Sequence, residues 1–263
     1  MANQTSLLSY LQTAPPAIST NPPARPGRNT TNRCYRASDI HSTAVWQAFN
    51  LNTIMQDYRT VLNQTQLAAD PMPASPPRPV PTEEALKEKL NEYITPSVRR
   101  ALRAGFGHLA ATGQDGGTTA IVYNSGGFAK KIHRYTPDTA YFDPTVASGT
   151  SPNRAPGDYK PSWKWTSALA TDNATANRTR YKQVLAQVNY YMKQHQTRYG
   201  FILTDRELVA IRRLDYQGNL ELAAPIPFAT RGTVQQPQLT VLLALWYLGM
   251  LAAQDQGADY WSL

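Results

Sequence analysis

The sequence is poor in cysteine, with Cys34 as the single example among 263 residues. One thiol cannot form an intramolecular disulfide, nor can it supply a zinc site built from several cysteines. The histidines offer no alternative, because His108, His133 and His195 are scattered without the spacing of metal ligands. The sequence therefore predicts neither a disulfide-stabilised fold nor a zinc centre, and it is typical of a reducing compartment.

Long apolar stretches are also missing. The most apolar segment, 239–253, has about 15 residues, whereas a membrane-spanning helix needs about 20. The opening residues, MANQTSLLSYLQTAPP, have neither the basic start nor the sustained apolar stretch of a secretory signal. We therefore expect a soluble intracellular protein, nuclear or cytoplasmic, without a membrane partner, in which 239–253 is a buried core helix.

The motifs of two large enzyme classes do not occur. No G-x-x-x-x-G-K-[ST] segment is present, which argues against a fused ATPase. No G-x-S-x-G segment or Cys–His signature is present either, so nothing indicates acyl-transfer chemistry.

The charge that the chain does carry is mainly positive. It has 26 Lys and Arg against 18 Asp and Glu, which gives a formal net charge of +8 and a pI near 9.6. Basic proteins favour polyanions, because each phosphate neutralised by Lys or Arg releases a condensed counterion. The same balance also serves solubility alone, and composition does not decide between the two interpretations.

Proline divides the chain into two parts. The first 33 residues are rich in Pro, Thr, Asn and Arg and are expected to form a flexible basic arm. Apolar residues at helical spacing predict a helix over 44–66, and a Pro-dense linker follows at 70–81. We therefore expect residues 1–81 to form an N-terminal region of flexible arm, short helix and Pro-rich linker, and residues 82–263 to form the folded domain.

Helical and strand patterns alternate along residues 82–263. Thr82 is expected to cap a helix that runs to about Tyr93, and Pro96 to open a second helix that includes Phe106. Strands are expected at 118–123, 131–135, 139–142, 157–160, 199–203 and 208–214, and helices at 175–196 and 239–253. This order predicts an α/β (α+β) domain with a central mixed sheet flanked by helices.

One set of residues has the chemistry of phosphodiester hydrolysis, in which carboxylates hold Mg²⁺ and an ammonium orients water or offsets charge. Asp158 and Lys160 are two apart in an extended segment, so they share a face, and a neighbouring strand could bring Asp138 beside them. Gln187 and Tyr191 are four apart on the following helix and also share a face.

These residues resemble the motifs of the PD-(D/E)XK nuclease superfamily. Pro137-Asp138 followed by Asp158-Tyr159-Lys160, and then Q-x-x-x-Y from Gln187, is similar to the pattern of its RecB-like exonuclease branch, over roughly residues 82–214. The resemblance implies a restriction-endonuclease-like fold and Mg²⁺- or Mn²⁺-dependent cleavage of DNA. It also implies that Asp138 and Asp158 bind the metal and that Lys160 positions the attacking water, while Gln187 and Tyr191 contact the DNA backbone or brace the site.

An upstream carboxylate or histidine often completes the metal site in these nucleases, as the resemblance implies. Glu88, Glu92 and His108 are the candidates here. We favour Glu92, because it is late on the helix before the sheet.

Two further segments could contact nucleic acid. Lys164 lies in the tract Pro161-Ser162-Trp163-Lys164-Trp165, whose aromatics could stack on bases, and Arg212 is part of an arginine pair that could line a phosphate-binding groove. The tryptophans could equally pack against the helix near residue 175, and the arginines could simply lie on an exposed face.

Other interpretations stay open. Asp138 could form an Asx-type turn after Pro137, Lys160 could be a solvated loop lysine, and Tyr191 could be a core residue. At the level of function, the alternatives are an inactive nuclease-like domain that binds nucleic acid or a protein partner, and a module of a larger toxin or self-recognition system. The sequence predicts no oligomeric state.

Overall fold

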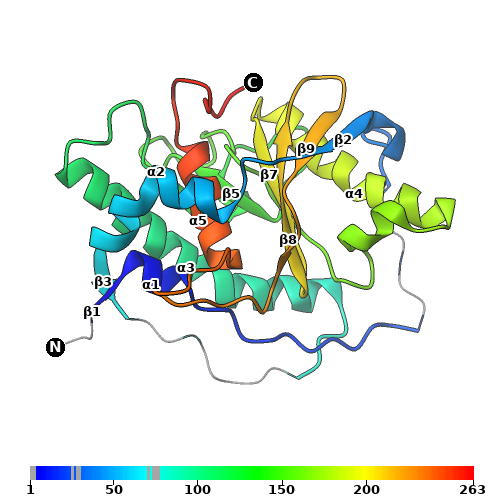
Figure 1. Ribbon diagram of the computed structural model, residues 1–263. Coiled ribbons are helices and arrows are strands. Elements are labelled where there is room, and N and C mark those ends of the chain that lie inside the picture. Colours follow the sequence, from blue (N-terminus) through cyan, green and yellow to red (C-terminus); the bar gives the residue numbers. More distant parts are fainter. Residues whose placement is uncertain (1–3, 25–26, 28–30, 70–71, 73–77) are drawn as a thin grey trace.

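A mixed β-sheet forms the centre of the computed structural model, which describes residues 4–24, 27, 31–69, 72 and 78–263 (Figure 1). In this part of the chain the sheet has eight strands, with β10 beside β8 and the others in the order β2-β9-β8-β7-β6-β5-β4. β2 and β9 pair in parallel, as do β6 and β7, and the remaining neighbours are antiparallel. The bounds are β2 (Ser42–Val45), β4 (Val122–Ser125), β5 (Thr139–Phe142), β6 (Gly157–Tyr159), β7 (Tyr199–Leu203), β8 (Glu207–Arg213), β9 (Asn219–Leu222) and β10 (Ile226–Pro227).

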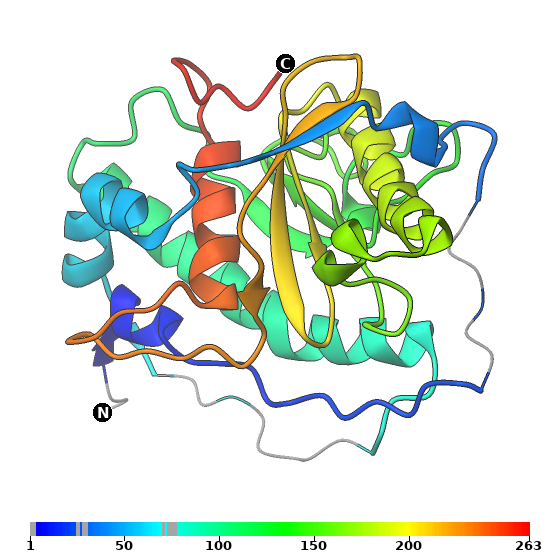
Figure 2. The same cartoon turned by 45° about the vertical axis from the view of Figure 1, so that its right-hand side comes forward.

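Helices cover both faces of this sheet (Figure 2), which confirms the predicted α/β class. One face packs against α1 (Leu7–Leu11), α2 (Leu51–Gln64), α3 (Glu83–Ala111) and α5 (Val241–Ala252), and the other against α4 (Thr175–Gln194). Side chains of β7 point alternately to the two faces of the sheet, which explains the two layers. Phe201 and Leu203 pack in the hydrophobic core shared with α1, α2, α3 and α5, and Ile202 packs beneath α4.

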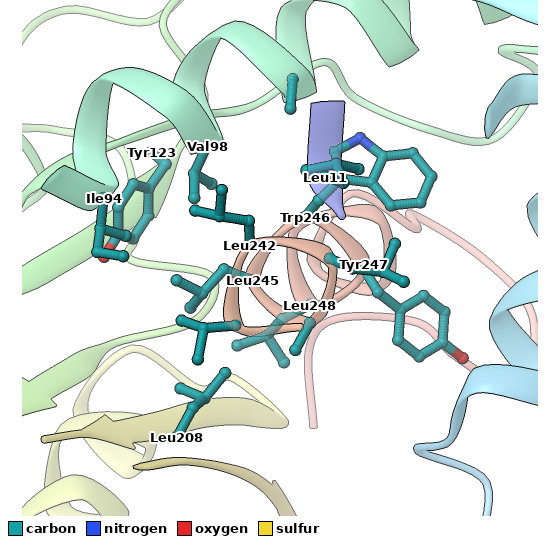
Figure 3. Close-up of a cluster of buried hydrophobic side chains, with 14 of the residues drawn as sticks. Leu11, Ile94, Val98, Tyr123, Leu208, Leu242, Leu245, Trp246, Tyr247 and Leu248 are labelled. Atoms are coloured by element: carbon teal, nitrogen blue, oxygen red, sulfur yellow. The ribbon is translucent and has the colours of Figure 1, made fainter. Parts of the chain in front are cut away.

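The predicted helix at 239–253 is present as α5, and all of its residues are buried. A helix that is apolar all round has no face suited to water, so it becomes the centre of the core. Figure 3 shows Leu11, Val98 and Leu208, from three different elements, around its side chains. Gly249 permits the close contact with α3, because a Cβ there would lie 2.6 Å from Leu102 Cδ2.

The expected break before Pro96 is wrong, because α3 is one helix of 29 residues with this proline inside it. Thr82 caps it as predicted and accepts a hydrogen bond from the Ala85 N–H at 3.1 Å. A proline removes one backbone hydrogen bond and strains the preceding turn. The exposed Pro96 is tolerated because Ile94 and Val98, on either side, are fully buried in the core.

The N-terminal residues differ from the expected flexible arm. Residues 4–6 form β1 (Gln4–Ser6), which pairs with β3 (Gln66–Ala68), and Leu7, Leu8 and Leu11 of α1 are buried in the main core. A leucine cluster this short has no periodicity of its own, and its partners are far away in the sequence. Residues 1–3, 25–26 and 28–30 of the arm, and 70–71 and 73–77 of the Pro-rich linker, lie outside the described residues.

Several local expectations also need correction. The segment 42–45 is strand β2 rather than the start of a helix, and α2 begins only at Leu51. Residues 131–135 form a tight turn closed by an isolated bridge between Ile132 and Tyr135, not a strand, and β9 and β10 were not expected. Among the described residues, no helix is both long and apolar enough to cross a membrane.

The close contact of α3 and α5 at Gly249 leads to a stability prediction. Gly249→Val should lower the free energy of unfolding by about 1–3 kcal/mol, because its methyl groups would meet Leu102 and Tyr141. Gly107→Ala is the matched control, because nothing lies within 4 Å of a Cβ at that position of α3 and it should stabilise by up to about 1 kcal/mol. Urea unfolding of both variants measures the difference, and equal effects would contradict the packing described.

Candidate functional site

The candidate site is built on β6, a three-residue strand between β5 and β7. Asp158 lies on this strand and Lys160 directly follows it, and their side chains form an ion pair of 2.7 Å. Only 3% of the Asp158 side chain and 2% of the Lys160 side chain are exposed. The two residues therefore share a face, as their spacing predicts, and Lys160 is not a solvated loop lysine.

Gly157 explains how so short a strand fits at this place. A Cβ there would lie 2.1 Å from Phe201 Cζ and 2.3 Å from Thr139 Oγ1, so only glycine permits this approach of β5 and β7. The glycine thus fixes the depth at which the neighbouring Asp158 lies.

Asp138 reaches the same place from the residue before β5. Its Oδ2 accepts a hydrogen bond from the Tyr159 N–H at 2.8 Å, and its Oδ1 lies 3.0 Å from Lys87 Nζ. Among the described residues, the Asp138 carboxylate therefore binds across to the next strand and to α3, and it does not form the Asx-type turn of the alternative interpretation.

α4 covers the pair from the other side. Gln187 Nε2 donates to Asp158 Oδ1 at 3.2 Å and lies 3.0 Å from the Tyr191 hydroxyl. Gln187 and Tyr191 are both buried, so the expected i,i+4 pair faces the sheet.

A residue to which the sequence assigned no role in the site completes the charge network. Glu83, in the first turn of α3, lies 3.4 Å from Lys160 Nζ, 2.8 Å from Lys164 Nζ and 3.4 Å from Lys87 Nζ. In the sequence, Glu83 is simply a carboxylate in the first turn of a helix, where it interacts favourably with the helix dipole. The sequence does show Lys87 four residues after Glu83, but an i,i+4 ion pair is common on helix surfaces and does not by itself indicate a functional site.

These side chains line a cavity of about 330 Å³, which we call the Asp158 pocket. It is bounded by Asn32, Tyr35, Glu83, Lys87, Arg134, Tyr135, Thr136, Asp138, Asp158, Lys160, Gln187 and Tyr191. Each carboxylate that lines it, from Glu83, Asp138 and Asp158, is ion-paired with a lysine.

Other predicted site residues lie elsewhere. The Glu92 side chain is 46% exposed and pairs with Lys89 at 2.7 Å, so it does not reach the Asp158 pocket. Glu88 and His108, also on α3, do not line it either. The α3 residues that line the pocket are Glu83 and Lys87, one turn apart at the start of the helix.

Arg212 also lies away from the pocket, because it projects from the opposite face of the sheet. It pairs with Glu221 and lies over the Trp46 ring at 5.0 Å, whereas Asp158 faces α4. Its partner Arg213 is fully buried. Lys164 is at the edge of the site through Glu83, and Trp165 is buried and stacked on Tyr181, as the packing alternative expected.

Burial and charge act in opposite directions on the ionisable groups. Burial raises the pKa of Asp158 to about 6, with a further contribution from Asp138, while Lys160 opposes the rise. Burial would lower the pKa of Lys160, but Asp158, Glu83 and Asp138 outweigh it and raise that pKa above its ordinary value. Burial likewise opposes ionisation of Glu83, but Lys160 and its neighbours outweigh it and lower the pKa to about 2. All three groups are therefore charged at pH 7.

Two side chains that line the pocket, Asp138 and Asp158, carry carboxylate oxygens, the type of ligand that Mg²⁺ prefers. Within the described part of the chain, no three His, Cys, Asp or Glu side chains are grouped so that they could hold a metal ion. Mg²⁺, however, keeps several waters and is commonly bound through one or two carboxylates plus substrate phosphate. Gln187 Oε1 is buried and accepts no hydrogen bond from the described residues, whereas Asp158 Oδ2 is held by the Lys160 ammonium at 2.7 Å. Asp138 and Asp158 could therefore act as ligands, with Gln187 as a third oxygen.

Larger hollows exist, but they lack this chemistry. A cavity of about 640 Å³ between α2, α3 and the C-terminal segment is lined mainly by amides and small residues, with Asp57 and Asp259 as its charged groups. Another of about 460 Å³ has Arg99 and Arg103 over an apolar floor. Neither combines carboxylates with buried lysine.

The role of Glu83 can be tested through stability. Because its pKa is lowered from 4.5 to about 2, its contribution is complete above pH 4.5 and is lost as the pH falls towards 2. Glu83→Gln should reduce the free energy of unfolding at pH 7 by about 2 kcal/mol after allowance for partial exposure, with a smaller loss at pH 3. Glu92→Gln should change it by less than about 0.5 kcal/mol. Equal losses for both variants in urea unfolding would count against the Glu83 network.

No protein-family model matches the chain, and neither a curated protein nor a solved structure matches it. Its function therefore has to be inferred from the chemistry of the Asp158 pocket.

Proposed function

We propose that the chain is a Mg²⁺- or Mn²⁺-dependent nuclease that hydrolyses phosphodiester bonds in DNA, as its resemblance to PD-(D/E)XK nucleases implies. The observation that carries the proposal is the convergence of Asp138, Asp158 and Lys160 in one buried pocket. Asp138 comes from the residue before β5, whereas Asp158 and Lys160 come from β6 and the residue after it. An ordinary surface would not withdraw two carboxylates and a lysine from water together.

Asp138 and Asp158 are the metal ligands in this proposal. A bound divalent cation would lower the pKa of a coordinated water and neutralise charge on the phosphate. Asp158 would be held in position by Gln187, which donates to its Oδ1, and Asp138 by the Tyr159 N–H. Gln187 is thus a positioning residue for one ligand, and Tyr191 supports Gln187 from the next turn of α4.

Lys160 acts as a cation rather than as a base. Its pKa is raised by the surrounding carboxylates, so the amine stays protonated at neutral pH. An ammonium can donate hydrogen bonds to the attacking water and offset negative charge that develops on the phosphate. Lys164, held by Glu83 at the edge of the pocket, remains a candidate for phosphate contact, whereas the position of Arg212 does not support that role.

The alternative is an inactive nuclease-like domain that binds nucleic acid or a protein partner. It is favoured by one observation: lysines already neutralise the pocket carboxylates in the protein alone, with Lys87 on Asp138 and Lys160 on Asp158. A DNA partner is supported by the net charge of +8, and a nuclear or cytoplasmic location would suit such a partner.

Cleavage of labelled single- and double-stranded DNA with Mg²⁺ or Mn²⁺ tests the function. Asp158→Asn and Asp138→Asn should each reduce the rate at least about a hundredfold, because each removes a charged ligand, and Lys160→Met should do the same by removing the cation. Chelator should abolish activity in the wild type.

Glu92→Gln is the matched control, because this carboxylate lies outside the pocket and should leave the rate unchanged. Cleavage that survives the three pocket substitutions would sink the site assignment. No cleavage by the wild type, with nucleic-acid binding retained, would favour the inactive domain.

The pKa of Asp158 gives a pH dependence for metal binding. Protons compete with the metal for this carboxylate, whose pKa is raised to about 6, so Mn²⁺ affinity should be constant well above pH 6 and fall about tenfold per unit below it. Calorimetric titration with Mn²⁺ on both sides of pH 6 measures this. Asp158→Asn should lose the binding, and an affinity that is flat through pH 6 would contradict Asp158 as a ligand.

A further inference from the structure

Two tight turns form one wall of the Asp158 pocket at its mouth. The first lies in residues 31–40, which we call the strap, and is closed by a bridge between Asn32 and Tyr35. The second, the 132–135 turn, is closed by a bridge between Ile132 and Tyr135. Asn32 and Tyr35 from the strap, and Arg134 and Tyr135 from the other turn, line the pocket.

The two turns contact each other and are both held by α4. The Tyr135 hydroxyl lies 3.6 Å from Cys34 Sγ, and the Tyr35 and Tyr135 rings pack edge to face at 6.4 Å. Gln183 of α4 accepts from the Ala37 N–H at 3.1 Å, and Gln194 of the same helix donates to the Ile132 carbonyl at 3.2 Å. The wall is therefore continuous and positioned by the helix that positions Asp158.

The 132–135 turn stores backbone strain. His133 and Arg134 have φ of 50° and 66°, in the left-handed region that Gly and Asn adopt readily and other residues rarely do. A two-residue hairpin turn with both central residues in this region ordinarily carries Asn-Gly. Such strain persists only where the surrounding structure holds it in place, and it clusters at active sites and ligand-binding sites. Among the described residues, the Arg134 guanidinium forms no hydrogen bond or ion pair, and Arg134 is exposed where it lines the pocket.

The size of the pocket limits what can reach its floor. At about 330 Å³ it lies at the small end of cavities that accept a single small ligand. Asp158 and Lys160 are each 2% exposed, so a phosphate must enter the cavity to reach them. A flexible single strand can bend one backbone phosphate into so small a cavity, whereas a stiff duplex must be deformed to do so. Arg36 and Lys131, both exposed, add positive charge near the two turns.

We infer that the strap and the 132–135 turn form a clamp for single-stranded DNA, in which Arg134 contacts a backbone phosphate and the partly exposed Tyr135 offers a face for base stacking. The inference rests on the proposed nuclease function and assigns its substrate as an unpaired strand. Arg134 is a binding residue here and takes no part in the bond-breaking step.

Binding is measured by fluorescence anisotropy in chelator, so that no cleavage is required. The probes are a short labelled oligothymidylate and a duplex of mixed sequence closed by hairpin loops at both ends, whose stem carries the label. We expect the single strand to bind at least about tenfold more tightly than the closed duplex.

Arg134→Gly is the decisive variant, because glycine removes the guanidinium and also relieves the strained φ. It should weaken binding of the single strand about fivefold and make the slope of log affinity against log salt shallower by about 0.7, the loss of one phosphate contact. Its melting temperature should not fall, so a loss of affinity cannot be ascribed to unfolding.

Two controls match this variant. His133→Gly relieves the same turn but keeps the guanidinium, and Arg231→Ala removes an exposed cation from the loop before α5, where Gly232 bonds to Gln12. Both should bind the single strand like the wild type. Equal binding of the closed duplex, or an Arg134→Gly variant that behaves like these controls, would overturn the clamp.

The outcome separates this inference from the proposed function. Arg134-dependent binding of single strands without cleavage under any metal would leave the clamp in place and remove the nuclease. Metal-dependent cleavage of the closed duplex at a rate unchanged by Arg134→Gly would support the nuclease function and rule out the clamp.

Discussion

The ion pair between Lys160 and Asp158 is the interaction on which the rest of the site depends. Two opposite charges almost wholly removed from water lose several kcal/mol of hydration each, which their attraction offsets only with further partners. Glu83 and Gln187 are those partners, one from α3 and one from α4. The pair thus constrains helices on both faces of the sheet, and the short strand β6 carries it between them.

Much of the architecture follows from local patterns in the sequence. The strand β5, the helix α4 and the buried α5 lie close to their expected positions, because periodicity and β-branched or aromatic runs are properties of neighbouring residues. The shared face of Asp158 and Lys160 follows in the same way from a spacing of two. These features need no knowledge of what packs against them.

The remainder depends on contacts between distant segments. Glu83 joins the site because the start of α3 passes β6, which no spacing reveals. Arg212 lies outside the site because of the strand register. Arg212 pairs with Tyr199 and Asp158 pairs with Ile202, and these two residues of β7 point to opposite faces of the sheet. The leucines of α1 likewise find their partners only in the folded core. Register and helix placement are tertiary properties, so a sequence pattern can propose a residue without deciding where its side chain lies.

The glutamines of α4 have a mechanical consequence. Gln183 holds the strap, Gln187 holds Asp158 and Gln194 holds the 132–135 turn, so the mouth and the floor of the cavity share one rigid rod as their reference. The strap, Asp158 and the 132–135 turn are therefore tied to one another through α4, in addition to the sheet that carries Asp158. Gln183 and Gln194 are 11 residues apart, so about three turns of α4 separate the two points at which the helix holds the wall of the pocket.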